Sequence, residues 1–232
     1  MAAAIELVGI GNALVDVFSS VDEDLGLLFK LESSRPVHLS YEKLSEILAA
    51  LPEPVLSSGG GTANVVKLAS GLGLSTAFIG SVGSNPAGKA DRFAQFFEKE
   101  LQNAGVSTHL SRSSEPTGAC AILRFGEDQN YIAASPSAAL SLKAQDLDEG
   151  LIKDARVLVL DGFLLEREDL VNRALSLADE AGTAIALDVS SVRISTDELA
   201  ARIESRQEYP IILFLNEAEA DAFCHAASIQ TG

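Results

Sequence analysis

The sequence predicts an α/β fold, with a central, mostly parallel sheet, helices on both of its faces, and a small β-sheet lid. Beyond residue 140, short and continuously apolar runs alternate with amphipathic helical patterns, which is typical of parallel strands buried by crossover helices. Three of these runs also end in a polar residue, namely Asp161, Asp188 and Asn216. Because ligands of such sheets bind beyond the carboxyl ends of the strands, we expect these three side chains to line one crevice.

The first 140 residues carry further strand and helix patterns. The strand patterns are short apolar runs, and the helix patterns begin at capping residues such as Ser40 and end at proline or glycine. A polar tetrapeptide, GEDQ, separates two strand patterns and predicts a hairpin. The predicted strands are a pair within 5–21 that is broken at Gly9 and Gly11, then 75–83, 117–125 and 130–137, and the predicted helices are 40–51, 62–73 and 88–105.

The remaining chain alternates between the two kinds of element. Gly182 is a typical stop signal for one of the helices. No internal repeat or long linker divides the sequence, so its 232 residues suit one large domain. The predicted helices are 146–155, 167–182, 197–205 and 217–227, and the predicted strands are 156–162, 183–191 and 210–216.

Composition and charge disfavour several classes of partner. The net charge is −16, and an acidic surface is unsuited to nucleic acids or anionic membranes, because both are bound through Lys and Arg. Cys120 and Cys224 are far apart in the sequence, so we expect two reduced thiols. The N-terminus has no signal-peptide pattern, and no apolar run is long enough to cross a bilayer. We therefore expect a cytoplasmic protein without nucleic-acid or membrane partners.

Three consecutive glycines precede the helix predicted at 62–73. Gly59, Gly60 and Gly61 carry no side chains, so the main chain can approach a ligand there and the N–H groups of the first helical turn can bind it. A tight strand-to-helix turn is an equally good interpretation of this motif alone. Neither GxxxxGK[ST] nor GxGxxG is present, which disfavours a P-loop ATPase and leaves a nicotinamide oxidoreductase as a weak alternative.

Polar residues near these glycines indicate a binding function. Asn12 and Asp16 follow the first strand, and Asn64 follows the glycine run. A carboxylate accepts hydroxyl hydrogens and a carboxamide both donates and accepts, so this set suits a polyol. Taken alone, Asp16 is more simply a turn or capping residue. The combination predicts a site for sugar hydroxyls.

Four segments, in order, resemble the ribokinase-like (PfkB) carbohydrate kinases, and within them the adenosine-kinase-like branch. GIGNALVDV resembles the first strand and substrate turn of that family. SGGGTANVVKLASGLG, followed by AFIGSVGSNPAG, resembles its first signature. EPTGACAIL is similar to the strand that continues into the lid, and LNEAEADAF resembles an N-x-x-E motif. The resemblance runs from residue 5 to the end of the sequence.

This resemblance implies a kinase reaction, in which ATP is the co-substrate, Mg²⁺ is the metal cofactor and a sugar hydroxyl is the acceptor. Asp16 would hold the hydroxyls of a small-molecule sugar or nucleoside. A lid formed by residues from about 18–40 and 108–138 would exclude water. The other residues implied in substrate binding are Asn12, Gly59, Gly60, Gly61, Asn64, Gln129 and Phe163.

The resemblance places Asn216 and Glu219 near the triphosphate, where Glu219 would hold Mg²⁺ through water. From the residues alone, the preferred interpretation of this pair is a helix N-terminus with favourable acids. Phe163 lies in DGFLL, which suits either a position near the base of a nucleoside or a simple strand end.

The sequence departs from the family pattern in ways that bear on catalysis. The D-T-x-G-A-G-D stretch, which supplies the anion hole and the catalytic Asp of the family, does not occur. Asn85 stands where the family usually has Asp, and Gln129 stands where a substrate-gripping Arg is often found. We therefore expect residues 1–232 to form a ribokinase-like domain that is incomplete at its C-terminus and inactive as a kinase by itself. A non-catalytic sugar- or nucleoside-binding module or partner subunit is the alternative.

An incomplete sheet also implies a particular mode of assembly. If no strand follows the one predicted at 210–216, apolar surface and an unpaired edge are exposed. We expect a homodimer or other self-association to cover them, unless the sheet ends naturally at this strand.

Overall fold

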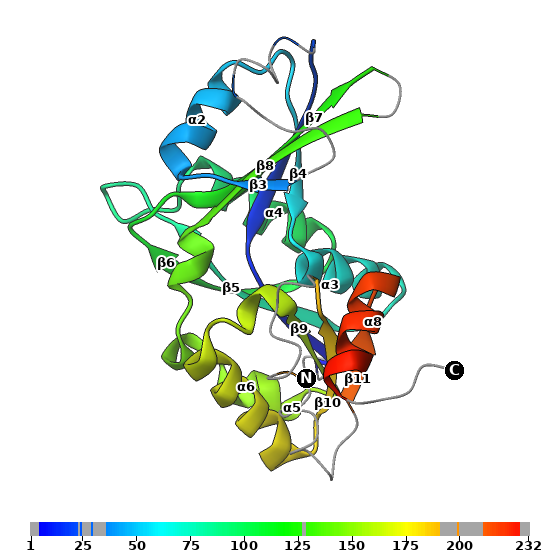
Figure 1. Ribbon diagram of the computed structural model, residues 1–232. Helices are drawn as coiled ribbons and strands as arrows, with labels where there is room; N and C mark the ends of the chain where they lie inside the picture. Colours follow the sequence, from blue (N-terminus) through cyan, green and yellow to red (C-terminus); the bar gives the residue numbers. More distant parts are fainter. Residues whose placement is uncertain are drawn as a thin grey trace.

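The computed structural model describes residues 5–22, 36–126, 129–190 and 211–227, together with Asp24, Phe29 and Leu199. These residues form two β-sheets with helices packed against them. The smaller sheet lies at the top of Figure 1, and the larger sheet lies below it. This arrangement confirms the predicted α/β class.

The larger sheet has six strands among the described residues, in the order β11-β10-β9-β1-β5-β6, and all neighbouring pairs are parallel. The strands are β1 (Leu7–Ile10), β5 (Thr76–Gly83), β6 (Ser107–Ser113), β9 (Val157–Asp161), β10 (Ala184–Asp188) and β11 (Ile211–Phe214). Most are apolar, as predicted for strands that are covered on both faces. β6 was not predicted, because its polar sequence STHLSRS carries no strand pattern, and it lies at an edge of the sheet.

Helices cover both faces of this sheet. They are α3 (Gly61–Gly71), α4 (Arg92–Asn103), α5 (Glu149–Asp154), α6 (Glu168–Ala181) and α8 (Glu217–Ala226). Gly9 of β1 faces Val66 of α3, so α3 lies on the face to which Gly9 points. The opposite face, with Val8 and Ile10, packs in one apolar cluster with α5, α6 and Phe223 of α8. The alternating helices and strands predicted beyond residue 140 are therefore confirmed where the structure describes them.

The smaller sheet has five strands among the described residues, in the order β3-β8-β7-β2-β4. They are β2 (Leu14–Ser20), β3 (Pro36–His38), β4 (Val55–Gly59), β7 (Thr117–Phe125) and β8 (Gln129–Ser137). β7 and β8 form the predicted antiparallel hairpin, whereas β2 pairs with β7 in parallel. α2 (Tyr41–Ala49) packs against β7 and β8 through Leu44 and Ile47, which covers one face of this sheet.

The ranges expected to form a lid are divided between the two sheets. Residues 18–20 and 36–38 and the β7–β8 hairpin belong to the smaller sheet, whereas residues 108–113 lie in β6 of the larger sheet. β3 and β4 show no strand pattern in the sequence, because β3 has three residues and β4 ends in two serines and a glycine. The helix predicted at 197–205 lies outside the described residues, apart from Leu199.

Capping residues set several helix boundaries. Ser40 accepts a hydrogen bond from Lys43 N at the start of α2, as its sequence predicts. Gly182 ends α6 in the left-handed conformation. Among the described residues, no helix combines the length and the apolar character that crossing a membrane requires.

A polar junction joins the two sheets. Asp91, the N-cap of α4, accepts hydrogen bonds from Ala94 N at 2.7 Å, from Thr117 Oγ1 at 2.8 Å and from Thr117 N at 2.8 Å. Thr117 Oγ1 also accepts from Gly83 N at 2.9 Å. Gly83 ends β5 of the larger sheet and Thr117 begins β7 of the smaller one, so these bonds fix one sheet to the other.

Candidate functional site

Asp16 lies in the middle of β2, between Ser57 of β4 and Cys120 of β7. Its carboxyl group lies against Gly59, because a Cβ atom on that glycine would stand only 2.3 Å from Asp16 Oδ1. No described residue donates a hydrogen bond to this half-buried carboxylate. Its acceptor sites are therefore open to the hydroxyl groups of a ligand.

Gly60 brings the loop after β1 against the start of α3. It is the N-cap of α3 and has a φ of +96°, which glycine adopts readily. A Cβ atom there would stand 2.3 Å from the backbone oxygen of Asn12, and one on Gly61 would stand 3.5 Å from Asp188 Oδ2. Asn64, one turn into the helix, is exposed, and no described residue bonds its side chain. The first turn of α3, with its free N–H groups, thus lies beside Asn12 and Asp188.

Asn12 is held by an arginine that the sequence analysis missed. Asn12 is only 7% exposed, and Arg167 Nη2 donates a hydrogen bond to its Oδ1 at 2.8 Å. Arg167 Nη1 donates to the backbone oxygen of Ala139 in the short helix η1 (Ala138–Ser141), also at 2.8 Å. Arg167 stands among acidic residues in LLEREDL, a pattern typical of a solvated helix start, so only the fold reveals this contact.

Burial shifts the pKa values of Asp16 and of the ionisable groups around it. It raises the pKa of the Asp16 carboxyl, and the nearby Lys67 ammonium opposes that shift. Burial lowers the pKa of Lys67, whereas Glu100 and Asp16 raise it. Lys67 Nζ donates to the backbone oxygen and the Oγ of Ser58, both at 2.8 Å. Burial and Asp16 together raise the pKa of Cys120 to about 12, so its thiol is neutral at physiological pH.

Asp161 and Asp188 meet at the carboxyl ends of β9 and β10, where they are register partners. Asp161 is buried and accepts a hydrogen bond from Phe163 N at 3.0 Å. Burial raises the pKa of Asp161, and Asp188 adds to the shift, whereas the bond from Phe163 N and the Arg167 charge oppose it. Two of the three polar strand ends therefore lie together as predicted, and Asp188 also approaches Gly61.

Asn216 and Glu219 form a capping box at the start of α8. Asn216 Oδ1 accepts a hydrogen bond from Glu219 N at 2.9 Å, and Glu219 Oε2 accepts from Asn216 N at 3.0 Å. Glu219 is buried, and the described residues contain no group of three metal-ligating side chains. These residues do not fit a magnesium site as they stand, so we assign no step to Mg²⁺ or to Glu219.

Phe163 provides apolar surface next to Asp161, to which its backbone N–H donates. It lies in η3 (Gly162–Leu164), directly after β9, and is 44% exposed. Its ring meets that of His38 in β3 edge-on, with a centroid distance of 6.5 Å. His38, Ala134, Cys120 and Asp16 occupy one row across β3, β8, β7 and β2 of the smaller sheet. Phe163 therefore lies at the β3 end of the row, and Asp16 lies about 14 Å along it.

Gln129 lies away from this row. It pairs with Phe125 at the start of β8, five residues before Ala134, which corresponds to about 17 Å along the strand. The register of the hairpin therefore separates Gln129 from Asp16, although both belong to the smaller sheet.

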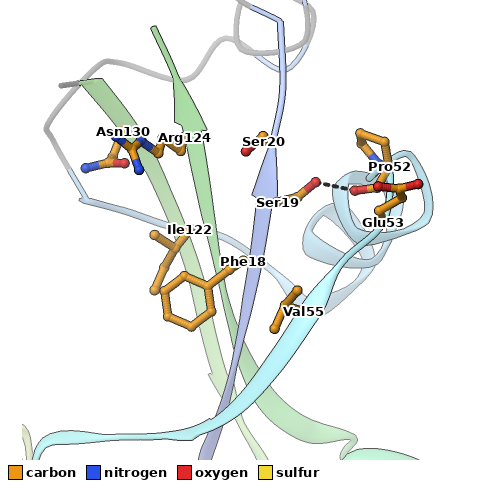
Figure 2. Close-up of a pocket in the computed structure, with 9 residues that line it drawn as sticks. All are labelled: Phe18, Ser19, Ser20, Pro52, Glu53, Val55, Ile122, Arg124 and Asn130. Atoms are coloured by element: carbon orange, nitrogen blue, oxygen red, sulfur yellow. Dashed lines mark hydrogen bonds between the residues drawn. The ribbon is translucent and has the colours of Figure 1, made fainter. Parts of the chain in front are cut away.

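A separate hollow of about 560 Å³ lies further along the same sheet. Figure 2 shows Phe18 beside Ile122 and Val55, with Ser19 donating a hydrogen bond to the backbone oxygen of Pro52 at its rim. None of the site residues predicted from the sequence lines this hollow. Its full lining is Phe18, Ser19, Ser20, Pro52, Glu53, Val55, Ile122, Arg124 and Asn130.

Comparison with known proteins agrees with this architecture. The chain is 26% identical over 236 residues to adenosine kinase of Saccharomyces cerevisiae, which covers 95% of this chain and 66% of that protein. It is 28% identical over 193 residues to fructokinase-1 of Zea mays, covering 79% of this chain and 58% of that protein. The crystal structure of adenosine kinase from Sinorhizobium meliloti matches with a TM-score of 0.82 at 19% identity, covering 96% of this chain and 68% of that chain.

The extent of the match and the family of the chain complete this comparison. The chain spans 66% of the length of the yeast protein that it resembles. In addition, residues 33–231 match the pfkB family carbohydrate kinases, a transferase family. The family expected from the four sequence segments is thus confirmed, and the chain belongs to the pfkB family of carbohydrate kinases.

Proposed function

We propose that the described residues bind the acceptor substrate of a sugar or nucleoside kinase, and that a ribonucleoside is the preferred ligand. The observation that carries this proposal is the Asp16 carboxylate, which lies against Gly59 and receives no hydrogen bond from any described residue. Binding the hydroxyls of a furanose would supply the missing donors. Phe163 favours a nucleoside over a free sugar, because its exposed ring offers apolar surface to a base.

The reaction that such a site serves in a kinase is the transfer of a phosphoryl group from ATP to a hydroxyl of the ligand, with Mg²⁺ supplied together with the nucleotide, and the part that we propose for the described residues is to hold the acceptor. Such transfer depends mainly on positioning and on neutralising charge. Asp16 accepts hydrogen bonds from the ligand hydroxyls, and Asn12 fixes their orientation. Gly60 and Gly61 let the main chain approach the ligand. No described residue is assigned to remove the hydroxyl proton, because the sequence contains no Gly-Ala-Gly-Asp segment.

Calorimetry and thermal unfolding with adenosine, guanosine, ribose and fructose test the binding proposal. We expect a ribonucleoside at a hundredfold excess over its Kd to raise the Tm by about 5 °C. Because the hydroxyls are bound by Asp16, the shift should disappear in Asp16→Ala and persist in Asp221→Ala, which changes an exposed acid of α8. An unchanged Tm with all four ligands would rule out this site as a binding site for furanoses.

Mg-ATP distinguishes a kinase from a binding module. Without a Gly-Ala-Gly-Asp segment, we expect the 232 residues to bind the nucleoside but to release no ADP from ATP. Nucleoside-dependent ADP release that Asp16→Ala abolishes would contradict this expectation and show a complete kinase.

We also propose self-association through the open edge of the larger sheet. Among the described residues, no strand pairs with the outer edge of β11. Ile212 and Phe214 of β11 are 50% and 56% exposed. Ile212 is in register with Ala186, Val159 and Gly9, so it points to the face that α3 partly covers. α3 itself exposes Leu68 and Leu72, and apolar surface of this kind is a typical interface.

Sedimentation at several protein concentrations tests this surface. We expect the wild-type chain to associate with increasing concentration and Phe214→Lys to shift the equilibrium towards the monomer at least about tenfold. Val55→Lys, which places the same charge on an exposed apolar position of β4, should leave the equilibrium unchanged. A wild-type chain that stays monomeric at all concentrations would contradict the proposal.

A further inference from the structure

We propose that Arg167 is a positioning residue, which fixes the Asn12 side-chain amide so that its Nδ2 group faces the ligand hydroxyls. Its part in ligand binding depends on the function proposed above. The contact joins distant parts of the chain, because Asn12 follows β1 and Arg167 immediately precedes α6. The hydrogen bond from Arg167 Nη2 to Asn12 Oδ1 measures 2.8 Å.

The chemistry of the pair determines the orientation of the amide. A guanidinium group only donates hydrogen bonds, so the atom of Asn12 that faces Arg167 has to be the oxygen. The Nδ2 group of Asn12 consequently points away from Arg167, and no described residue accepts a hydrogen bond from it. Without Arg167, the amide could turn and present either its donor or its acceptor to the site.

Arg167 is itself held in place. Its Nη1 donates to the backbone oxygen of Ala139 at 2.8 Å, and Ala139 is buried. The two bonds leave from different terminal nitrogens of one planar group, so they fix the plane of the guanidinium as well as its position. The Arg167 Nε atom is buried without a hydrogen-bond partner among the described residues, so the two terminal bonds, together with the charge of the nearby Asp161, hold this side chain.

A fixed donor at Asn12 complements the acceptor at Asp16. A hydroxyl group can donate to the Asp16 carboxylate and accept from Asn12 Nδ2 at the same time. The backbone oxygen of Asn12 meets Gly60, and the Asp16 carboxyl meets the adjacent Gly59, so the main chain of Asn12 and the Asp16 carboxyl lie at the same glycine turn. A site with one donor and one acceptor in fixed places distinguishes a hydroxyl from a hydrogen atom, because the analogue that lacks the hydroxyl leaves both unpaired.

The first measurement needs no ligand. In ¹⁵N-labelled protein, the side-chain NH₂ of Asn12 is identified by its absence in Asn12→Asp, and its order parameter is measured by relaxation. We expect it to fall from about 0.8 in the wild type to below about 0.6 in Arg167→Met. It should stay high in Arg167→Lys, which still donates, and in Arg173→Met, which alters an arginine of α6 that pairs with Glu149 instead. An unchanged order parameter in Arg167→Met would overturn the proposal.

The second measurement uses adenosine, 2′-deoxyadenosine and 3′-deoxyadenosine as probes. The wild type should bind adenosine about tenfold more tightly than the analogue that lacks the hydroxyl contacted by Asn12. Arg167→Met should reduce that ratio to about threefold or less, and it should have no further effect in the Asn12→Ala background. A ratio that survives Arg167→Met would overturn the role in selectivity.

The two measurements separate this proposal from the proposed function. If the wild type binds none of the three nucleosides but the order parameter falls in Arg167→Met, the positioning of Asn12 is supported and the nucleoside-binding function is wrong. If all three bind to the wild type and the order parameter does not change, the function stands and the positioning role is wrong.

Discussion

Asp16→Asn should weaken ribonucleoside binding by about tenfold to a hundredfold while making the protein without ligand more stable at neutral pH. Binding weakens because the variant loses the charge-assisted hydrogen bonds to ligand hydroxyls, each of which contributes about 1.5–3 kcal/mol. Stability rises because the variant has no half-buried carboxylate whose charge is partly desolvated. Calorimetric titration and urea unfolding of the same two proteins measure both effects.

The pH dependence of this difference follows from the raised pKa of Asp16. The folded state binds this proton more tightly than the unfolded state does, so ionised Asp16 lowers the free energy of unfolding above its folded pKa. That loss disappears as the pH falls through the folded pKa towards the ordinary value of 3.8. The extra stability of Asp16→Asn should therefore be largest at neutral pH and should shrink on acidification. Asp221→Asn serves as the control, and an equal gain in both variants would contradict this explanation.

Gly60→Ala should destabilise the fold by about 2–4 kcal/mol and abolish ligand binding. The φ of +96° is strained for alanine, and the added Cβ atom would stand 2.3 Å from the backbone oxygen of Asn12. The loop after β1 and the start of α3 would therefore have to separate, which moves the two groups that border the ligand. Urea unfolding gives the change in stability, and calorimetry gives the change in affinity.

Gly71→Ala is the matched control for this experiment. Gly71 ends the same helix, and a Cβ atom there would have no heavy atom within 4 Å. We expect this substitution to be neutral or to stabilise the protein by up to about 1 kcal/mol, because alanine is the better helix former. A similar loss of stability in both variants would show that the conformation of Gly60 is not special.

The sequence was informative where one local pattern determines both structure and contact. Continuous apolar runs predicted the parallel strands, since only strands covered on both faces avoid polar positions. Asn12, Asp16 and the bare main chain at Gly59 and Gly60 were expected to lie together, and the fold places Gly59 against the Asp16 carboxyl and Gly60 against the backbone oxygen of Asn12. β6 was not predictable in this way, because its pairing with β5 compensates for a polar sequence.

Local sequence patterns of this kind do not predict contacts between distant segments of the chain. The bond between Asn12 and Arg167 spans 155 positions of the chain, and no local spacing indicates it. The separation of Gln129 from Asp16 depends on the register of the hairpin, which sequence alone leaves open. Asn216 and Glu219 show the opposite case, because the local sequence indicated a helix N-terminus and the structure has a capping box there. The place near the triphosphate that the family resemblance implies stays a prediction.

The Asp91–Thr117 junction restricts how far the two sheets can separate where β5 meets β7. The hydrogen bond from Gly83 N to Thr117 Oγ1 ties β5 to β7, and Asp91 at the start of α4 holds Thr117 through two more bonds. β5 and β9 flank β1 on opposite sides in the larger sheet. Ligand entry that preserves these bonds therefore requires a hinge rotation about the β5 side. We expect such a rotation to widen the β9 side most and to separate the rings of His38 and Phe163, which meet there.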